Sequence, residues 1–106
     1  MRRGDLVTIA VSGDYGKPRP ALVVQSDAFD RHPSVIVLPL TSEIHDAPLF
    51  RVTVAAGDAT GLGAPSQIMV DKATTVPRSK LGSRIGEVDT TTMQAVNEAL
   101  LGFLGL

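Results

Sequence analysis

Short apolar stretches separated by turn residues run along most of the chain. Such stretches, rich in β-branched residues and bounded by Gly, Pro, Asp or Ser, predict short strands. They occupy residues 6–11, 20–25, 34–40, 49–55, 67–70 and 74–76. Consecutive apolar positions in 20–25 and 34–40 are typical of central strands, whereas the alternation in 49–55 is typical of a strand exposed on one face. The connection 57–65 holds three glycines and a proline and is expected to be turn-rich.

Only the C-terminal segment has the apolar spacing of a helix. Asp89 is the expected N-cap and Gly105 the expected stop. The predicted apolar face consists of Met93, Val96, Leu100, Phe103 and Leu104. Residues 1–106 are therefore expected to form a single, mainly β domain, a small bent barrel with a C-terminal α-helix. The helix must pack on the barrel or on a partner, and packing on the barrel is the default.

Composition excludes several kinds of chemistry. The 106 residues contain no cysteine, so disulfides, a thiolate nucleophile and a cysteine zinc site are ruled out. There are only two histidines, and the acidic residues lack the spacing of a calcium loop, so we expect no metal and no cofactor. The chain has neither a signal-like start nor an apolar run of about 20 residues, which predicts a cytoplasmic protein with no membrane contact.

The net charge of −1 gives no general attraction to nucleic acid, but the basic residues are grouped. Four cations and no acid lie between residues 72 and 84, and four more cations lie in the first nineteen residues beside two acids. These groups indicate either two solvated basic faces or a surface for a polyanion, and charge alone does not decide between them.

Four blocks of sequence, in order and at matching spacing, resemble the MazF/PemK family of type II toxin–antitoxin toxins. They lie at residues 3–7, 19–29, 35–42 and 93–106. The resemblance implies an SH3-like barrel of the CcdB/MazF type that forms a two-fold homodimer. It also implies a metal-independent endoribonuclease that cuts single-stranded RNA by attack of the 2′-OH, leaving a 2′,3′-cyclic phosphate and a 5′-OH. A cognate antitoxin would fill the RNA groove.

Arg19 and Thr41 are the candidate catalytic residues. RNA cleavage of this kind needs a base, an acid and a cation on the phosphorane. Arg19 enters the second predicted strand, and its guanidinium suits phosphate oxygens; the resemblance implies a catalytic role, and a charged arginine is better suited to act as acid than as base. Thr41 ends the 34–40 strand, where its hydroxyl could bond a phosphate. Taken without the resemblance, both residues also fit ordinary surface or strand-end positions.

Five further residues are candidates for substrate binding. They are Tyr15, Lys17, Ser42, Asp71 and Lys72. A tyrosine in the short first loop could stack on an unpaired base, although a lone loop tyrosine packs on a barrel rim equally often. The 71–74 block departs from the family pattern, because lysine stands at position 72 where glutamine is usual and threonine stands at 74 where a basic residue is common. These departures put the RNA preference in doubt.

Three questions stay open from sequence alone. His32 precedes a proline and His45 lies in a polar loop; either imidazole could serve acid–base chemistry near neutral pH, but a surface position is the simpler expectation for both. A CcdB-like gyrase poison is one alternative function, disfavoured because the chain has no tryptophan. A catalytically degenerate binding module is the other, and it is disfavoured because Arg19 and Thr41 are both present.

Overall fold

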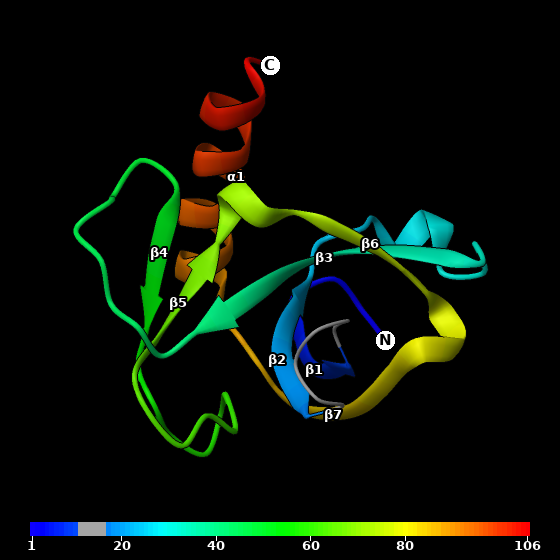
Figure 1. Cartoon of the computed structure of the whole chain (residues 1–106). Coiled ribbons are helices and arrows are strands. Elements are labelled where there is room, and N and C mark those ends of the chain that lie inside the picture. The colour runs from blue at the N-terminus through cyan, green and yellow to red at the C-terminus, as the bar shows by residue number, and fades with distance from the viewer. Residues whose placement is uncertain (11–16) are drawn as a thin grey trace.

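The computed structural model describes residues 1–10 and 17–106. Figure 1 shows a curled sheet with one long helix at its end. The elements in chain order are β1 (Asp5–Ala10), β2 (Pro18–Val23), η1 (Asp27–Phe29), β3 (Ser34–Thr41), β4 (Arg51–Val54), β5 (Ser66–Met69), η2 (Val70–Lys72), β6 (Thr74–Pro77), η3 (Arg78–Lys80), β7 (Leu81–Glu87) and α1 (Thr90–Leu104). Each of the six predicted strands is confirmed with shifted ends, and β7 was not predicted.

One antiparallel sheet with the order β4-β5-β3-β2-β1-β7 forms the barrel. The long strand β3 changes partner along its length: residues 34–37 pair with β6, whereas Leu40 and Thr41 pair with β5. This change of partner along one strand bends the sheet. The predicted small bent barrel with a C-terminal helix is therefore confirmed.

Alternate residues of the central strands face two separate apolar cores. On one face Leu6, Leu22 and Leu38 join β4, β5 and α1 in a single cluster. On the other face Val7, Ile9, Ala21, Val23, Val35 and Val37 pack together beneath β6 and β7. Strands β2 and β3 contribute to both clusters, which explains why they read as continuous apolar runs in the sequence.

The sequence did not predict strand β7, because glycines interrupt the pattern of apolar residues that marks a strand. A Cβ atom at Gly82 would lie 2.1 Å from Thr8 Oγ1, and one at Gly86 would lie 2.3 Å from the backbone of Thr60. Gly86 is thus required by the close approach of neighbouring backbone, and Gly82 lies tight against a threonine side chain, positions where glycine is expected within strands. The pairing of β7 with β1 also contains register shifts.

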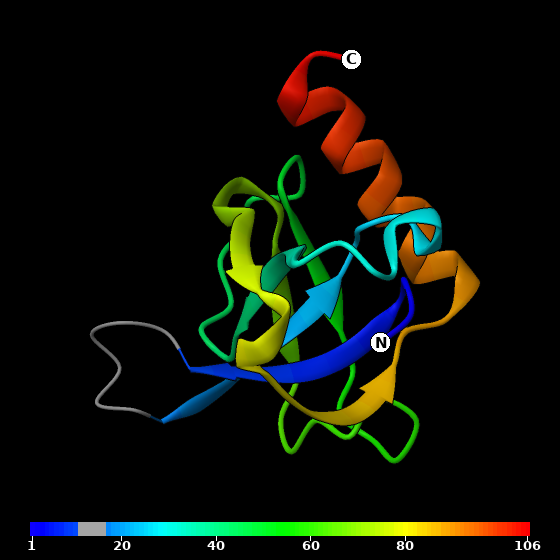
Figure 2. The ribbon, with the colours of Figure 1, turned by 90° about the vertical axis from the view of Figure 1, so that its right-hand side faces the viewer.

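Helix α1 begins and ends as the sequence predicts. The Asp89 carboxylate accepts a hydrogen bond from Thr92 N at 2.7 Å, and Gly105 ends the helix in the left-handed conformation with φ of 72°. Val96 is fully buried in the core, but the last turns project beyond the sheet (Figures 1 and 2). Leu101, Phe103, Leu104 and Leu106 are each at least half exposed there. In the described part of the chain, no helix is long and apolar enough to span a membrane.

Candidate active site

A cavity of about 780 Å³ lies where β2 begins and β3 ends, beside β4, β5 and η2. Its polar lining residues are Arg19, Thr41, Ser42, Glu43, His45, Arg51, Ser66, Lys72 and Thr74. Three of these side chains are basic and one is a carboxylate, so the cavity suits a polyanion. Several lining residues are exposed, so the cavity opens to solvent.

Arg19 and Thr41 meet at this cavity because of the register between their strands. Ala21 on β2 pairs with Pro39 on β3 in an antiparallel ladder. Arg19 lies two residues before Ala21 and Thr41 two residues after Pro39, at the same end of this ladder, and both line the cavity. Thr41 Oγ1 accepts a hydrogen bond from the amide N of Glu43 at 3.1 Å. A hydroxyl that accepts this bond can still donate its own proton, as a phosphate oxygen requires.

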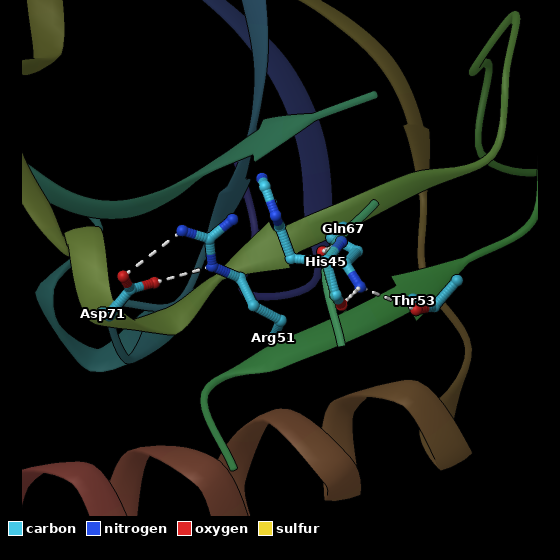
Figure 3. Close-up of polar contacts among 5 residues, drawn as sticks. All are labelled: His45, Arg51, Thr53, Gln67 and Asp71. Carbon is cyan, nitrogen blue, oxygen red and sulfur yellow. Dashed lines mark hydrogen bonds and ion pairs between the residues drawn. The ribbon is translucent and has the colours of Figure 1, made fainter. Parts of the chain in front are cut away.

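Arg51 is a cavity cation that sequence reasoning missed. The alternation in β4 placed it on the exposed face, yet only 11% of its side chain is accessible. Its Nε donates to Asp71 Oδ1 at 3.0 Å and its Nη2 donates to Asp71 Oδ2 at 3.3 Å, a two-pronged pair drawn in Figure 3. Its guanidinium carbon also lies 5.9 Å from the centre of the Phe50 ring. These contacts hold the arginine against the cavity wall.

Gln67 on β5 holds the loop that carries His45. It is 3% exposed, and its amide Oε1 accepts from His45 N at 3.0 Å while its Nε2 donates to His45 O at 2.8 Å. Nε2 also lies 3.3 Å from Thr53 Oγ1. Figure 3 shows the His45 ring and the Arg51 guanidinium extending to the same side of β4 and β5. No sequence signal pointed to Gln67, since its partners are backbone atoms 22 residues away.

The structure brings some of the predicted binding residues to the cavity and leaves others away from it. Ser42 and Lys72 line the cavity, whereas Asp71 stands behind the lining and pairs with Arg51. Lys17 is exposed before β2 and is absent from the lining. Tyr15 lies outside the described residues.

The basic stretch from 72 to 84 does not form one surface. Lys72 lines the cavity, but Arg78 donates to the carbonyl oxygens of His32 and Phe29. Arg84 pairs with Asp5 at 3.0 Å and with Glu87 at 3.3 Å. Within residues 1–10 and 17–106, no three His, Cys, Asp or Glu side chains are grouped as metal ligands.

The fold and the cavity define a class: a small SH3-like barrel with a cationic groove at its strand ends and a C-terminal helix. The sequence profile of PemK-like, MazF-like toxins of type II toxin–antitoxin systems matches residues 2–104. This chain belongs to that family. The resemblance seen in the sequence and the predicted CcdB/MazF-like fold are both confirmed.

Individual relatives agree over their whole length. A probable endoribonuclease MazF of Mycolicibacterium smegmatis is 50% identical over 107 residues, covering 100% of this chain and 98% of the relative. The structure of an endoribonuclease in complex with its cognate antitoxin, from a mycobacterial species, superposes with a TM-score of 0.82 at 29% identity and covers 100% and 96% of the two chains. The Mycobacterium tuberculosis toxin MazF-mt6 gives a TM-score of 0.83 at 26% identity, covering 96% and 97%.

Proposed function

We propose that this protein is the toxin of a type II toxin–antitoxin pair and acts as an endoribonuclease on single-stranded RNA. The observation that carries the proposal is the meeting of Arg19 and Thr41 at one cationic cavity. The family and the 50% identical relative named as an endoribonuclease support it. Messenger RNA in the cytoplasm would be the substrate.

The chemistry we propose uses the RNA's own 2′-OH as nucleophile. The 2′-oxygen bonds to the adjacent phosphorus and the bond to the 5′-oxygen breaks, which yields a 2′,3′-cyclic phosphate and a 5′-OH. Negative charge grows on the phosphorane in the transition state, and donors preorganised around it lower the barrier. Arg19 would donate hydrogen bonds to these oxygens and to the leaving oxygen, and the Thr41 hydroxyl would donate another. No metal enters this route.

Substrate binding would be shared among the other lining residues. Lys72 and Arg51 would attract the backbone phosphates, and Ser42 would add a polar contact beside Thr41. Asp71 would act indirectly, by orienting Arg51. Tyr15 and Lys17 would contact RNA from the first loop.

Two protein partners complete the proposal. A cognate antitoxin would bind this protein and, in our proposal, cover the cavity; the similar mycobacterial endoribonuclease was solved in complex with its cognate antitoxin, and the similar MazF of Deinococcus radiodurans in complex with MazE. A second copy of this chain would cover the projecting turns of α1, whose exposed leucines and phenylalanine would be costly to leave in water. Size-exclusion chromatography of the purified chain should then give twice the monomer mass.

The test is RNA cleavage by purified protein, with 5′ ends mapped by primer extension. Wild type should produce discrete 5′-OH ends in the presence of EDTA. Arg19→Ala and Thr41→Ala should each lower kcat by about 10²–10³-fold, the cost of removing one transition-state donor. Arg31→Ala and Thr75→Ala change exposed residues outside the cavity lining and serve as matched controls. Growth arrest that persists in both site variants, or DNA breaks without RNA cuts, would point to a gyrase poison instead.

A further inference from the structure

We propose that His45 is the general base of the reaction and that Gln67 is the residue that positions it. The inference rests on the proposed ribonuclease function and deepens it, because it assigns the group that removes the proton from the 2′-OH. The sequence left a role for His45 open and indicated none for Gln67.

The base is the role that Arg19 and Thr41 leave open. Arg19, Arg51 and Lys72 are cationic at neutral pH, and the hydroxyls of Thr41 and Ser42 are poor bases. Among the cavity residues that the structure describes, two remain that can accept a proton, His45 and Glu43. An imidazole titrates near neutral pH, where a general base is most effective, and it brings no negative charge toward the phosphate. His45 is therefore the better candidate.

Gln67 fixes His45 relative to the candidate catalytic threonine. Through its side chain it holds both the N–H and the C=O of His45. Through its backbone it pairs with Thr41 of β3 on one side and with Thr53 of β4 on the other. A single buried residue thus ties the loop of His45 to the strand end of Thr41. Binding sites are more effective when such a supporting contact fixes the reacting group.

Charged groups on several neighbouring elements line the same cavity as His45. They are Arg19 on β2, Arg51 on β4 and Lys72 on η2. Glu43 and Asp46 lie on the same loop as His45, and Asp71 pairs with Arg51. Removing one of these charges should shift the pH dependence of cleavage along the pH axis. Replacing His45 should abolish the rise of cleavage activity with pH that its imidazole produces.

The neutral His45 ring takes the proton from the 2′-OH as the 2′-oxygen bonds to phosphorus. The bond from phosphorus to the 5′-oxygen breaks, and that oxygen, hydrogen-bonded by Arg19, takes a proton from water entering the open cavity. The hydroxide left behind is neutralised by the proton that His45 returns to solvent, so the cycle consumes no net proton.

The decisive measurement is kcat/KM for a short RNA between pH 5 and pH 8. Wild type should gain activity as the pH rises through this range, because the base must be neutral to act. His45→Gln should lose about 10²-fold in activity near pH 7.5 and lose this rise with pH. The fold should survive, because Gln67 bonds to the backbone of His45 and not to its ring. His32→Asn is the matched control: His32 is the only other histidine, lies outside the cavity and binds Ser34 in a turn that asparagine can also form.

Two further variants separate positioning from chemistry. Gln67→Leu should lower kcat while the rise with pH stays, since the imidazole is present but less well placed. Gln67→Glu keeps an acceptor for His45 N and lacks the donor to His45 O, so its activity should fall between wild type and Gln67→Leu. Added imidazole should restore part of the activity of His45→Ala, a rescue that a merely structural role would not allow.

The outcomes are distinguishable. No cleavage by wild type or by His32→Asn would overturn the proposed ribonuclease function itself. Cleavage by wild type together with an unchanged rise with pH in His45→Gln would overturn the role of His45 alone. Loss of that rise in Glu43→Gln, and not in His45→Gln, would assign the base to the carboxylate and would also overturn the inference.

Discussion

The pair between Arg51 and Asp71 offers a quantitative test of how the cavity wall is built. Asp71→Asn keeps the size of the side chain and removes its charge. The guanidinium then loses a charged partner that holds two of its N–H groups at 3.0 and 3.3 Å. Since only 11% of the Arg51 side chain and 20% of the Asp71 side chain are accessible, water replaces little of what is lost.

The expected loss is about 2 kcal/mol in the free energy of unfolding. Breaking a fully buried pair costs about 3–5 kcal/mol, and a hydrogen bond to a charged group contributes about 1.5–3 kcal/mol. The loss for this variant should lie near the lower end of these ranges. Asp71 is partly exposed, and asparagine keeps one oxygen that can accept a hydrogen bond from Arg51. For a domain of this size such a loss lowers Tm by about 10 °C.

Urea unfolding followed by circular dichroism, at one fixed protein concentration, measures this loss directly. The matched control is Glu87→Gln, which removes the carboxylate of a pair whose acid is 66% exposed, and it should change stability by no more than about 0.5 kcal/mol. A double-mutant cycle with Arg51→Met should give a coupling energy of at least about 1 kcal/mol. If Asp71→Asn proves as mild as Glu87→Gln, the pair does not hold the wall and the reasoning fails.

Three further predictions concern the frame around the cavity. Val96→Ala removes two methyl groups from a fully buried position and should cost about 2–3 kcal/mol in urea unfolding; a loss under about 0.5 kcal/mol would mean that α1 is not anchored there. The hydroxyl and amide of Thr92 hold the pKa of Asp89 below its usual 3.8. This cap therefore stabilises the fold above about pH 4, and the stabilisation is lost as the pH falls through the pKa that Asp89 has in the folded state. Asp89→Asn should match wild type at pH 7 and flatten the dependence of Tm on pH between 2 and 4, and an unchanged dependence would contradict the assignment. Gly86→Ala should cost more than about 2 kcal/mol because its Cβ would lie 2.3 Å from the Thr60 backbone, whereas Gly63→Ala, with no atom within 4 Å, should be nearly neutral; equal effects would refute the close-approach argument.

The sequence predicted those parts of the fold that depend on local patterns. The cap residue Asp89 and the stop residue Gly105 bound α1 as expected, because capping is decided within a few residues. The central strands were evident because both their faces are buried. Strand β7 was missed because its glycines lie close to Thr8 and Thr60. These residues are distant in the sequence, so the local pattern does not reveal the contacts.

The candidate site was partly visible in the sequence, where a motif marks it, and partly hidden, where the fold assembles it. Arg19 and Thr41 were named from the motif and both line the same cavity, and their catalytic role stays a prediction. Arg51 looked like an exposed strand residue, because nothing near it in the sequence reveals Asp71 as its partner 20 residues later. Gln67 and His45 are likewise joined only through long-range pairing.

Arg51 also stands between the cavity and the helix. Its guanidinium lies over Phe50, whose ring centre is 6.0 Å from that of Phe103 on α1. A substitution at position 51 therefore disturbs the contact with α1 as well as the cavity. No substitution there changes the cavity alone. Exposed Ser42 and Lys72 carry no such double constraint. Under the proposed ribonuclease function, substitutions that alter RNA binding should then accumulate at the rim of the cavity, while its wall changes only when compensating substitutions arise in the helix.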